Sequence, residues 1–107
     1  MKKAPPAVPY EENLYETLKD PEEAAAYLNA ALDTAIQEND SDLFLLSLYH
    51  VARARGFKKT AAAAHVHRVS LHRMLSKGGN PEWKSLFNIL MGTKLRLRIE
   101  PVTSLAA

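Results

Sequence analysis

Residues 57–76, with the sequence FKKTAAAAHVHRVSLHRMLS, contain the pattern that decides the fold prediction. It is typical of a helix-turn-helix, in which two short helices cross steeply and are joined by a tight bend. Small or apolar residues occupy the positions where the two helices must touch: Thr60, Ala61, Ala64, Val66, Leu71 and Met74. The small side chain of Ala61 allows the two backbones to approach closely.

The second of these helices has one apolar face and one mainly basic face, because successive residues turn by about 100° around a helix axis. The apolar face consists of Leu71, Met74 and Leu75, and the opposite face of Val69, His72, Arg73 and Ser76. Arg68 lies at the start of the helix, where major-groove contacts usually arise. The pattern favours DNA binding, although an alanine-rich helical hairpin with solvated Arg and His side chains would have the same spacing.

The distribution of charge strengthens the prediction of DNA binding. Up to residue 42 the chain has ten acidic residues and three lysines, a net charge of −7. From residue 43 onward it has eleven basic and two acidic residues, a net charge of +9, so the formal total of +2 hides a strongly dipolar chain. The basic part contains the whole of residues 57–76 and is suited to attract a phosphate backbone.

Length and composition restrict the class of protein. A chain of 107 residues with 47% hydrophobic content can bury one modest core. The absence of cysteine excludes disulfides, cysteine-ligated zinc and thiol nucleophiles, and it agrees with a reducing cytosol. The first residues, MKKAPPAVPY, lack the apolar run of a signal peptide, and no stretch is long enough to cross a membrane. We therefore expect a soluble cytoplasmic protein without a membrane partner.

The chain divides into three predicted regions. Residues 1–13 contain Pro5, Pro6 and Pro9, which favour a flexible or extended N-terminal arm. Residues 14–103 form the single domain, and residues 104–107 form a C-terminal tail. The last residues, Leu-Ala-Ala, are similar to the end of the bacterial tag recognised by the ClpX protease, so a degradation signal is one hypothesis for the tail.

Helix signals recur before and after residues 57–76. Asp20 followed by Pro21 predicts the start of a helix that continues to about Glu38. Residues 39–41 interrupt the chain, and residues 43–55 are apolar around most of a helix, as in a central buried helix that Gly56 ends. A further helix is expected over residues 81–91 after Asn80 as the cap. Its expected buried residues are Trp83, Leu86, Phe87 and Leu90.

Residues 94–100 change to a two-residue period. Charged residues alternate there with Leu95, Leu97 and Ile99, which predicts a strand with one wet and one dry face. A lone strand leaves its backbone donors and acceptors unpaired. The required neighbour would be a second copy, another protein or the N-terminal arm.

Motifs along most of the chain resemble a known family. They are DPEEAAAYLNAAL at 20–32, DLFL at 42–45, VARARG at 51–56, GNP at 79–81 and LRL at 95–97. The chain resembles the addiction-module antidote family, HigA-type antitoxins with an Xre/Cro-like helix-turn-helix. With this resemblance, the fold prediction is a mainly α, five-helix Xre/Cro-like domain, to which the two-residue period of residues 94–100 adds one C-terminal β-strand. The resemblance also implies a bacterial or prophage protein that binds its own operator DNA as a homodimer and neutralises a RelE/HigB-like mRNA-cleaving toxin.

Three replacements separate this chain from the usual family pattern. Members usually carry Ser or Thr at the position of Lys58 and Gly at the position of His65, and the aliphatic residue usual at Thr60 is replaced by a more polar one. His65 must adopt a left-handed backbone, at a cost of about 1 kcal/mol, or the chain must bend differently.

Residue roles follow from the chemistry of DNA contacts. The expected base contacts are His67, Arg68, Val69, His72 and Arg73, because arginine forks onto guanine and the other side chains can touch thymine methyls or nearby bases. The expected phosphate contacts are Lys58, Lys59, Ser70 and Lys77. Arg53 and Arg55 are left open between a role in DNA binding and simple solvation of a helix end.

A metal or nuclease site is the weaker interpretation of His65, His67 and His72, since no carboxylate lies near them in sequence. We expect no enzyme activity, cofactor or small-molecule substrate. Two alternatives to a repressing antitoxin stay open. One is a prophage-type transcriptional regulator without a toxin partner, and the other is a toxin-neutralising module with weak DNA binding.

Overall fold

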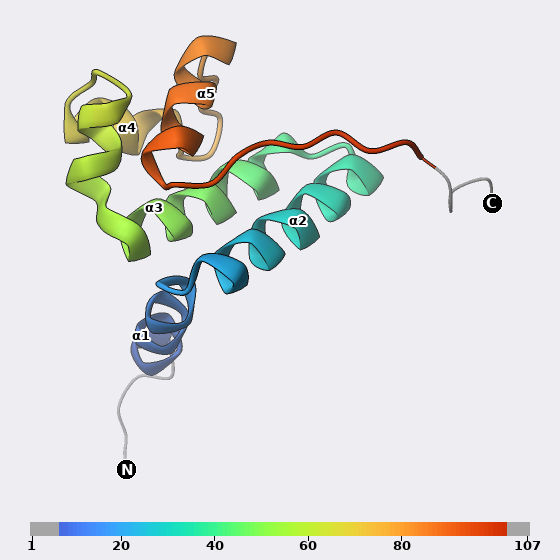
Figure 1. Cartoon of the computed structure of the whole chain (residues 1–107), viewed down its shortest axis with the longest axis horizontal. Coiled ribbons are helices and arrows are strands. Elements are labelled where there is room, and N and C mark those ends of the chain that lie inside the picture. The colour runs from blue at the N-terminus through green and yellow to red at the C-terminus, as the bar shows by residue number, and fades with distance from the viewer. Residues whose placement is uncertain (1–6, 103–107) are drawn as a thin grey trace.

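The computed structural model describes residues 7–102, with side chains from residue 12 onward. Its helices are α1 (Ala7–Leu18), α2 (Pro21–Glu38), α3 (Ser41–Ala63), α4 (Arg68–Met74) and α5 (Trp83–Gly92) (Figure 1). The predicted tail at 104–107, with its Leu-Ala-Ala ending, lies outside the described residues. No helix within the described part of the chain is long and apolar enough to cross a membrane.

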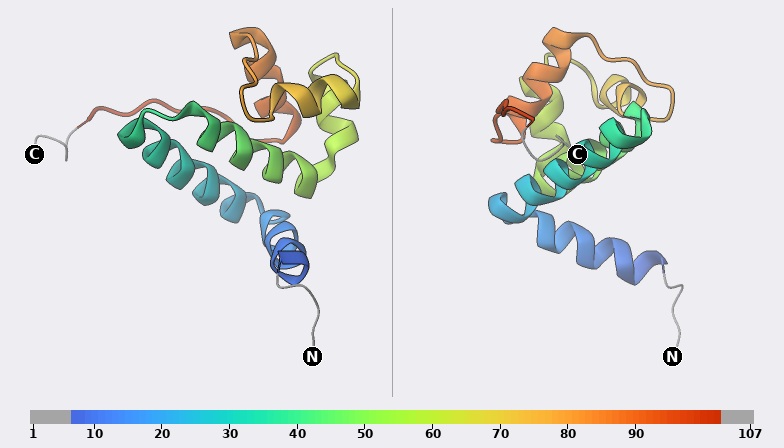
Figure 2. Two further views of the ribbon diagram at one scale, coloured as in Figure 1. Left: turned by 180° about the vertical axis from the view of Figure 1, so that it is seen from behind. Right: turned by 90° about the vertical axis from the view of Figure 1, so that its right-hand side faces the viewer.

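Helix α3 is the centre of the fold because it contacts each of the other four helices. Helices α2 and α3 run side by side, α1 packs at one end of this pair, and α4 and α5 lie on the other side of α3 (Figures 1 and 2). The core contains fully buried Leu18 from α1, Leu48 and Val51 from α3, Leu71 from α4 and Ile89 from α5. One hydrophobic core therefore joins all of these elements.

Helix α1 corrects the prediction of an extended arm over residues 1–13, because residues 7–13 are helical. Pro9 lies in the first turn of this helix. The amide groups of a first helical turn have no partner within the helix, so proline removes no hydrogen bond there. Leu18 at the end of α1 is only 1% exposed, and α1 thus belongs to the packed body.

Helix α2 confirms the predicted start and end. The side chain of Asp20 accepts a hydrogen bond from the Glu22 amide at 3.0 Å, and Pro21 occupies the first helical position. Asn39 ends the helix in the left-handed region, with φ 53°. Its neighbour Asp40 then caps α3 by accepting from the Asp42 amide at 3.1 Å.

The predicted end of the central helix at Gly56 corresponds to a kink. Helix α3 continues to Ala63, but Gly56 interrupts it with φ 118° and ψ 90°, a conformation that L side chains rarely adopt. The next turn is tied back to the kink because the Thr60 hydroxyl donates to the Gly56 carbonyl at 2.9 Å. The more polar residue at position 60 is therefore fully buried with its hydroxyl satisfied.

Helix α5 begins two residues later than predicted and presents a different buried face. Neither Asn80 nor Pro81 is helical, and Glu82 is the cap residue without a side-chain hydrogen bond. Leu90 is buried as expected, whereas Trp83 is 63% and Phe87 is 48% exposed. The prediction for these two aromatic residues is wrong because, among the helices of the described chain, α5 packs on α3 alone. One face is thus covered and the other is open.

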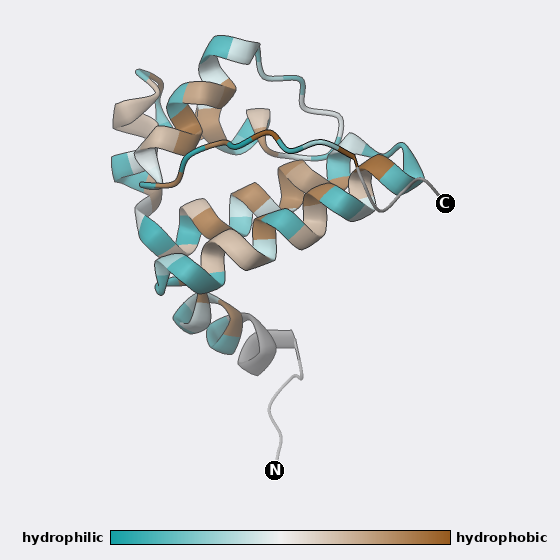
Figure 3. Cartoon of the chain, turned by 45° about the vertical axis from the view of Figure 1, so that its right-hand side comes forward, coloured by the Kyte–Doolittle hydropathy of each residue, from teal (hydrophilic) through white to brown (hydrophobic). Residues whose placement is uncertain are grey.

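The predicted C-terminal β-strand is wrong, since residues 95–102 are extended but belong to no strand. The segment crosses the molecule over α3 and α2 (Figure 1). Its hydropathy alternates along the chain (Figure 3), and Ile99 is 89% exposed. A two-residue period produces a strand only where a neighbouring strand pairs with it, and no strand occurs within residues 7–102.

Candidate functional site

The bend between α3 and α4 is built around His65. The Val66 amide donates to the Ala61 carbonyl at 3.0 Å, and the His65 amide donates to the Ala62 carbonyl at 3.1 Å. These two bonds, with His65 at φ 60°, form a Schellman motif. Of the two predicted possibilities, His65 therefore takes the left-handed backbone that glycine usually supplies.

Helix α4 has the two faces that the sequence predicts. Leu71 is fully buried, Leu75 is 2% exposed, and Met74 packs against the core. The opposite face contains exposed Arg68, Val69, His72 and Arg73, with half-buried Ser76 after the helix. Helix α4 is thus attached through its apolar side while its basic side faces outward.

The exposed face of α4 borders a shallow cleft of about 490 Å³. Four of the five predicted base contacts line this cleft, and two residues of α3 and Ser76 complete it. The lining residues are Arg53, Phe57, Arg68, Val69, His72, Arg73 and Ser76. The lining contains three arginines and no carboxylate, so the cleft has the electrostatic character of an anion-binding surface.

Aromatic rings from α3 support the cleft. The Tyr49 ring meets the Phe57 ring edge-on, with centroids 5.7 Å apart, and meets the His72 ring in the same way at 5.2 Å. The guanidinium carbon of Arg53 lies 5.9 Å from the Tyr49 centroid and 5.7 Å from that of Phe57. These contacts orient His72 and Arg53 towards the same surface.

Sequence reasoning left the role of Arg53 open, although a signal was present. Aromatic residues stand four positions before and four positions after it, at 49 and 57, and this spacing brings side chains together on one helix face. The kink at Gly56 interrupts the regular spacing, but the structure still places Arg53 over both rings.

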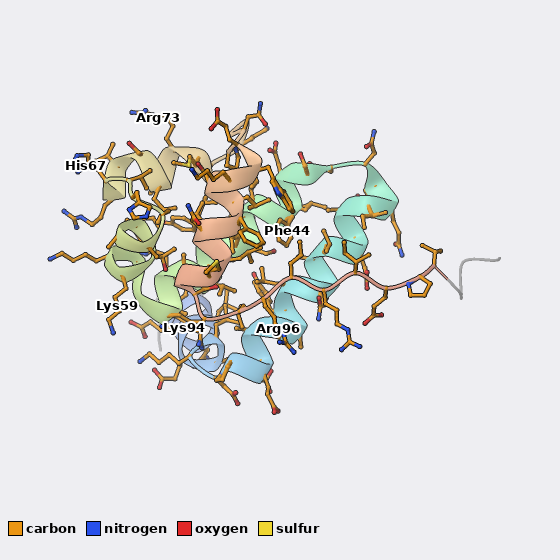
Figure 4. All side chains as sticks on the ribbon, turned by 45° about the horizontal axis from the view of Figure 1, so that its top comes forward. Phe44, Lys59, His67, Arg73, Lys94 and Arg96 are labelled. Carbon is orange, nitrogen blue, oxygen red and sulfur yellow. The ribbon has the colours of Figure 1, made fainter. Side chains whose placement is uncertain are left out.

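Five predicted contacts lie outside this cleft. They are His67, Lys58, Lys59, Ser70 and Lys77. His67 precedes α4 as its cap residue, exposed and without a side-chain capping bond. Figure 4 shows Lys59 projecting from α3 on the side of this end of the molecule opposite to Arg73. Lys59 therefore lies on the flank of this end of the molecule, apart from Arg73.

Arg55 has a structural role that the sequence analysis missed. Its Nε donates to the Thr93 carbonyl at 2.7 Å, and its Nη1 donates to the Lys19 carbonyl at 2.9 Å. These carbonyls lie at the C-terminal ends of α5 and α1, where helix carbonyls lack partners within the helix. Arg55 thus connects α1, α3 and α5.

His65, His67 and His72, for which a metal site was the weaker interpretation, do not gather into one in the described chain. Within residues 12–102, no three His, Asp or Glu side chains gather in a way that could hold an ion. His72 instead packs against Tyr49, and Ser76 donates to the His72 carbonyl at 2.6 Å.

The charge segregation of the sequence maps onto separate helices. Helices α1 and α2 contain acidic residues such as Glu22, Glu23 and Asp33, whereas the cleft between α3 and α4 is basic. Among the described side chains, Lys19 and Glu16 form one ion pair at 3.2 Å, and both are exposed. Arg68 and Arg73 therefore have no carboxylate partner within the described chain.

Comparisons with known proteins support the antidote family of the prediction. A family model described as "Probable addiction module antidote protein" matches residues 10–101. An uncharacterized protein of Haemophilus influenzae is 32% identical over 85 residues, which cover 79% of this chain and 84% of the relative. No solved structure matches significantly. The chain belongs to the family of probable addiction module antidote proteins, and an antidote implies a toxin partner of some kind.

Proposed function

We propose that this chain is the antitoxin of a type II toxin–antitoxin module, that it represses its own operon by binding operator DNA, and that it neutralises a RelE/HigB-like mRNA-cleaving toxin. Family membership supports the antitoxin role. The HigA-type, Xre/Cro-like helix-turn-helix of this proposal consists of residues 57–76. The protein acts in the cytoplasm, where both operator and mRNA are found, and it acts by binding, without enzymatic activity or a cofactor.

The basic cleft beside α4 is the observation that carries the DNA-binding part of the proposal. Three arginines converge there from two helices, and the lining has no acidic residue. A DNA major groove admits one α-helix, and arginine binds guanine through two parallel hydrogen bonds. Helix α4 offers such a surface because its apolar side is fixed in the core and its basic side is open.

Contacts divide into those that recognise bases and those that position the protein. Arg68 and Arg73 contact guanine edges in this proposal, while His67, Val69 and His72 contact thymine methyls or neighbouring bases. The phosphate contacts are Lys58, Lys59, Ser70 and Lys77. Arg53 joins the phosphate contacts because it lines the same cleft as Arg68 and Arg73.

The acidic helices α1 and α2 are the proposed docking surface for the toxin. Enzymes that bind RNA need basic surfaces, and complementary charge speeds association with a partner of the opposite sign. The residues of α2 that would face such a partner include exposed Glu22, Asp33 and Glu38. The toxin and the operator would then occupy different helices, so the two bindings need not compete.

Two single substitutions test the residue roles on the DNA upstream of the coding region. Arg73→Ala should reduce the binding free energy by about 1 to 3 kcal/mol for DNA that contains the guanine contacted by Arg73. For a fragment in which that base pair is changed, the loss should be much smaller. Lys59→Ala should weaken binding to all sequences alike. Arg96→Ala serves as the control, because this exposed arginine lies outside the cleft. Fluorescence anisotropy measures the affinities, and unchanged binding in both test variants would contradict the assignment.

Co-purification separates the proposed antitoxin from its alternatives. Expression with the neighbouring gene should yield a stable complex that contains a small basic protein, and a gel shift should detect operator binding with and without it. A regulator without a toxin would bind DNA but retain no such partner. A neutralising module with weak DNA binding would retain the partner and fail to shift the operator at micromolar concentration.

A further inference from the structure

Asp42 connects two parts of the molecule that are far apart in sequence. It lies in the first turn of α3, where its backbone amide donates to the capping side chain of Asp40. The half-buried carboxylate of Asp42 has another partner, because its Oδ1 accepts a hydrogen bond from the Gly78 amide at 3.2 Å. Gly78 belongs to the loop that follows α4. The bond therefore joins the start of α3 to this loop.

The loop after α4 contains a tight turn over residues 76–79. The Gly79 amide donates to the Ser76 carbonyl at 2.8 Å, and Gly78 has φ 79°. A positive φ at the third position is typical of a type II turn, which places Lys77 at the second position. A Cβ at Gly79 would clash with the Met74 carbonyl at the end of α4. The turn is thus held against α4 at Gly79 and against α3 at Gly78.

Lys77 is the exposed side chain that this turn presents. It directly follows Ser76, which lines the basic cleft, so it lies at the edge of the proposed DNA-binding surface. Within the described chain Lys77 and Asp42 do not form an ion pair. The carboxylate of Asp42 therefore acts on the backbone of the turn and leaves the lysine charge available to a phosphate.

We propose that Asp42 is a positioning residue for DNA binding. By holding the Gly78 amide it fixes the turn, and the fixed turn places Lys77 against a phosphate of the duplex. This inference rests on the proposed function, in which Lys77 is a phosphate contact. Because phosphate contacts carry no sequence information, Asp42 should affect binding to any duplex alike.

The sign of the effect separates positioning from simple charge. A carboxylate repels DNA, so the loss of its charge alone would strengthen binding. The loss of a positioning contact would weaken it. Asp42→Ala removes both the charge and the acceptor, whereas Asp42→Asn removes the charge but keeps a side-chain oxygen that can accept from Gly78. Asp40→Ala is the matched control, since it removes the same charge and a cap of α3 but leaves the bond to Gly78.

Nuclear magnetic resonance of the free chain tests the first step. Asp42→Ala should lower the heteronuclear NOE at residues 77–79 and speed hydrogen exchange of the Gly78 amide. Asp42→Asn and Asp40→Ala should keep both quantities close to the wild type. Circular dichroism checks that each variant folds. An unchanged NOE and unchanged exchange in Asp42→Ala would overturn the proposal.

The salt dependence of binding to a duplex of random sequence tests the second step. Lys77→Ala and Asp42→Ala should each lower the slope of log affinity against log salt by about one. Between about 0.05 and about 0.2 M salt, the affinity of each variant should then fall about 3.5-fold less than that of the wild type. Asp42→Asn and Asp40→Ala should keep the wild-type slope.

The double variant Asp42→Ala with Lys77→Ala completes the test. It should bind no more weakly than Lys77→Ala, because both changes remove one phosphate contact. Additive losses in the double variant, or tighter binding by Asp42→Ala, would overturn the proposal. A wild-type chain that binds no duplex would contradict the proposed function and with it the phosphate contact. The fixing of the turn by Asp42 is decided separately on the free chain.

Discussion

At the scale of single residues, His65 is a site of local backbone strain. Its φ of 60° places a residue with a Cβ where the Schellman motif prefers glycine. His65→Gly should therefore raise the free energy of unfolding by about 1 kcal/mol, as measured by urea denaturation. His65→Ala is the control, since it removes the imidazole but keeps a Cβ in the left-handed region and should gain little. A loss of stability in His65→Gly would show that the histidine side chain stabilises the bend.

Arg55 provides the second prediction at this scale. Arg55→Ala removes both bonds to helix-end carbonyls and should lower the free energy of unfolding by about 2 to 4 kcal/mol. Arg55→Lys keeps the charge but reaches at most one carbonyl, so its free energy of unfolding should lie between those of the wild type and Arg55→Ala. Thermal unfolding measures both, and Arg98→Ala on the exposed C-terminal segment is the control. Equal stability of Arg55→Ala and the control would rule out the connecting role.

At the scale of elements, the contact between α5 and α3 depends on Gly92. A Cβ placed on Gly92 would lie 2.9 Å from the Ala63 Cβ and 3.0 Å from the Thr60 Cα. Alanine stabilises a helix by about 1 kcal/mol relative to glycine. At position 92 this gain should be smaller than the cost of overpacking, which is about 1 to 3 kcal/mol. Gly92→Ala should lower the urea midpoint, while Lys84→Ala, an exposed change in the same helix, should not. A more stable Gly92→Ala variant would show that α5 shifts without cost.

Helices with both a terminal signal and an apolar period were predictable from the sequence. Helix α2 has Asp20 as its cap and a regular stripe of small and apolar residues, and its bounds were predicted closely. The sequence of α1 has prolines that suggest an arm, and only the burial of Leu18 shows that it packs. Local patterns do not reveal which elements will be neighbours, so the sequence did not predict which face of α5 is covered. For the same reason it did not show that residues 95–102 pair with no strand in the described chain.

The candidate site was predictable where it depends on one helix. The α4 face with Arg68, His72 and Arg73 follows from the period of the helix alone. The contribution of Arg53 depends on how α3 and α4 cross, and the crossing depends on the kink at Gly56 and the bend at His65. Sequence spacing does not determine those angles.

At the scale of the whole molecule, opposite charges occupy different helices, and the two proposed bindings should be separable. Asp33→Lys with Glu38→Lys should slow association with the co-purified toxin about tenfold at low salt, as measured by stopped-flow fluorescence, because it reverses charge on α2. Operator affinity should change little. The control pair, Glu82→Lys with Glu100→Lys, makes the same charge change at exposed residues outside α1 and α2. It should leave the rate of association with the toxin nearly unchanged. Equal slowing in both pairs would mean that net charge alone governs the rate.

Operator binding through α4 is the central claim, and a charge-matched pair of double variants tests it most directly. Arg68→Ala with Arg73→Ala removes two arginines of the cleft, and Arg96→Ala with Arg98→Ala removes two arginines from the C-terminal segment. The measurement is the affinity of each variant for the upstream DNA by fluorescence anisotropy at one fixed salt concentration. We predict a loss of about 2 to 6 kcal/mol for the α4 pair and a much smaller loss for the control. Equal losses in the two pairs, or a wild-type chain that does not distinguish this DNA from random sequence, would contradict the claim.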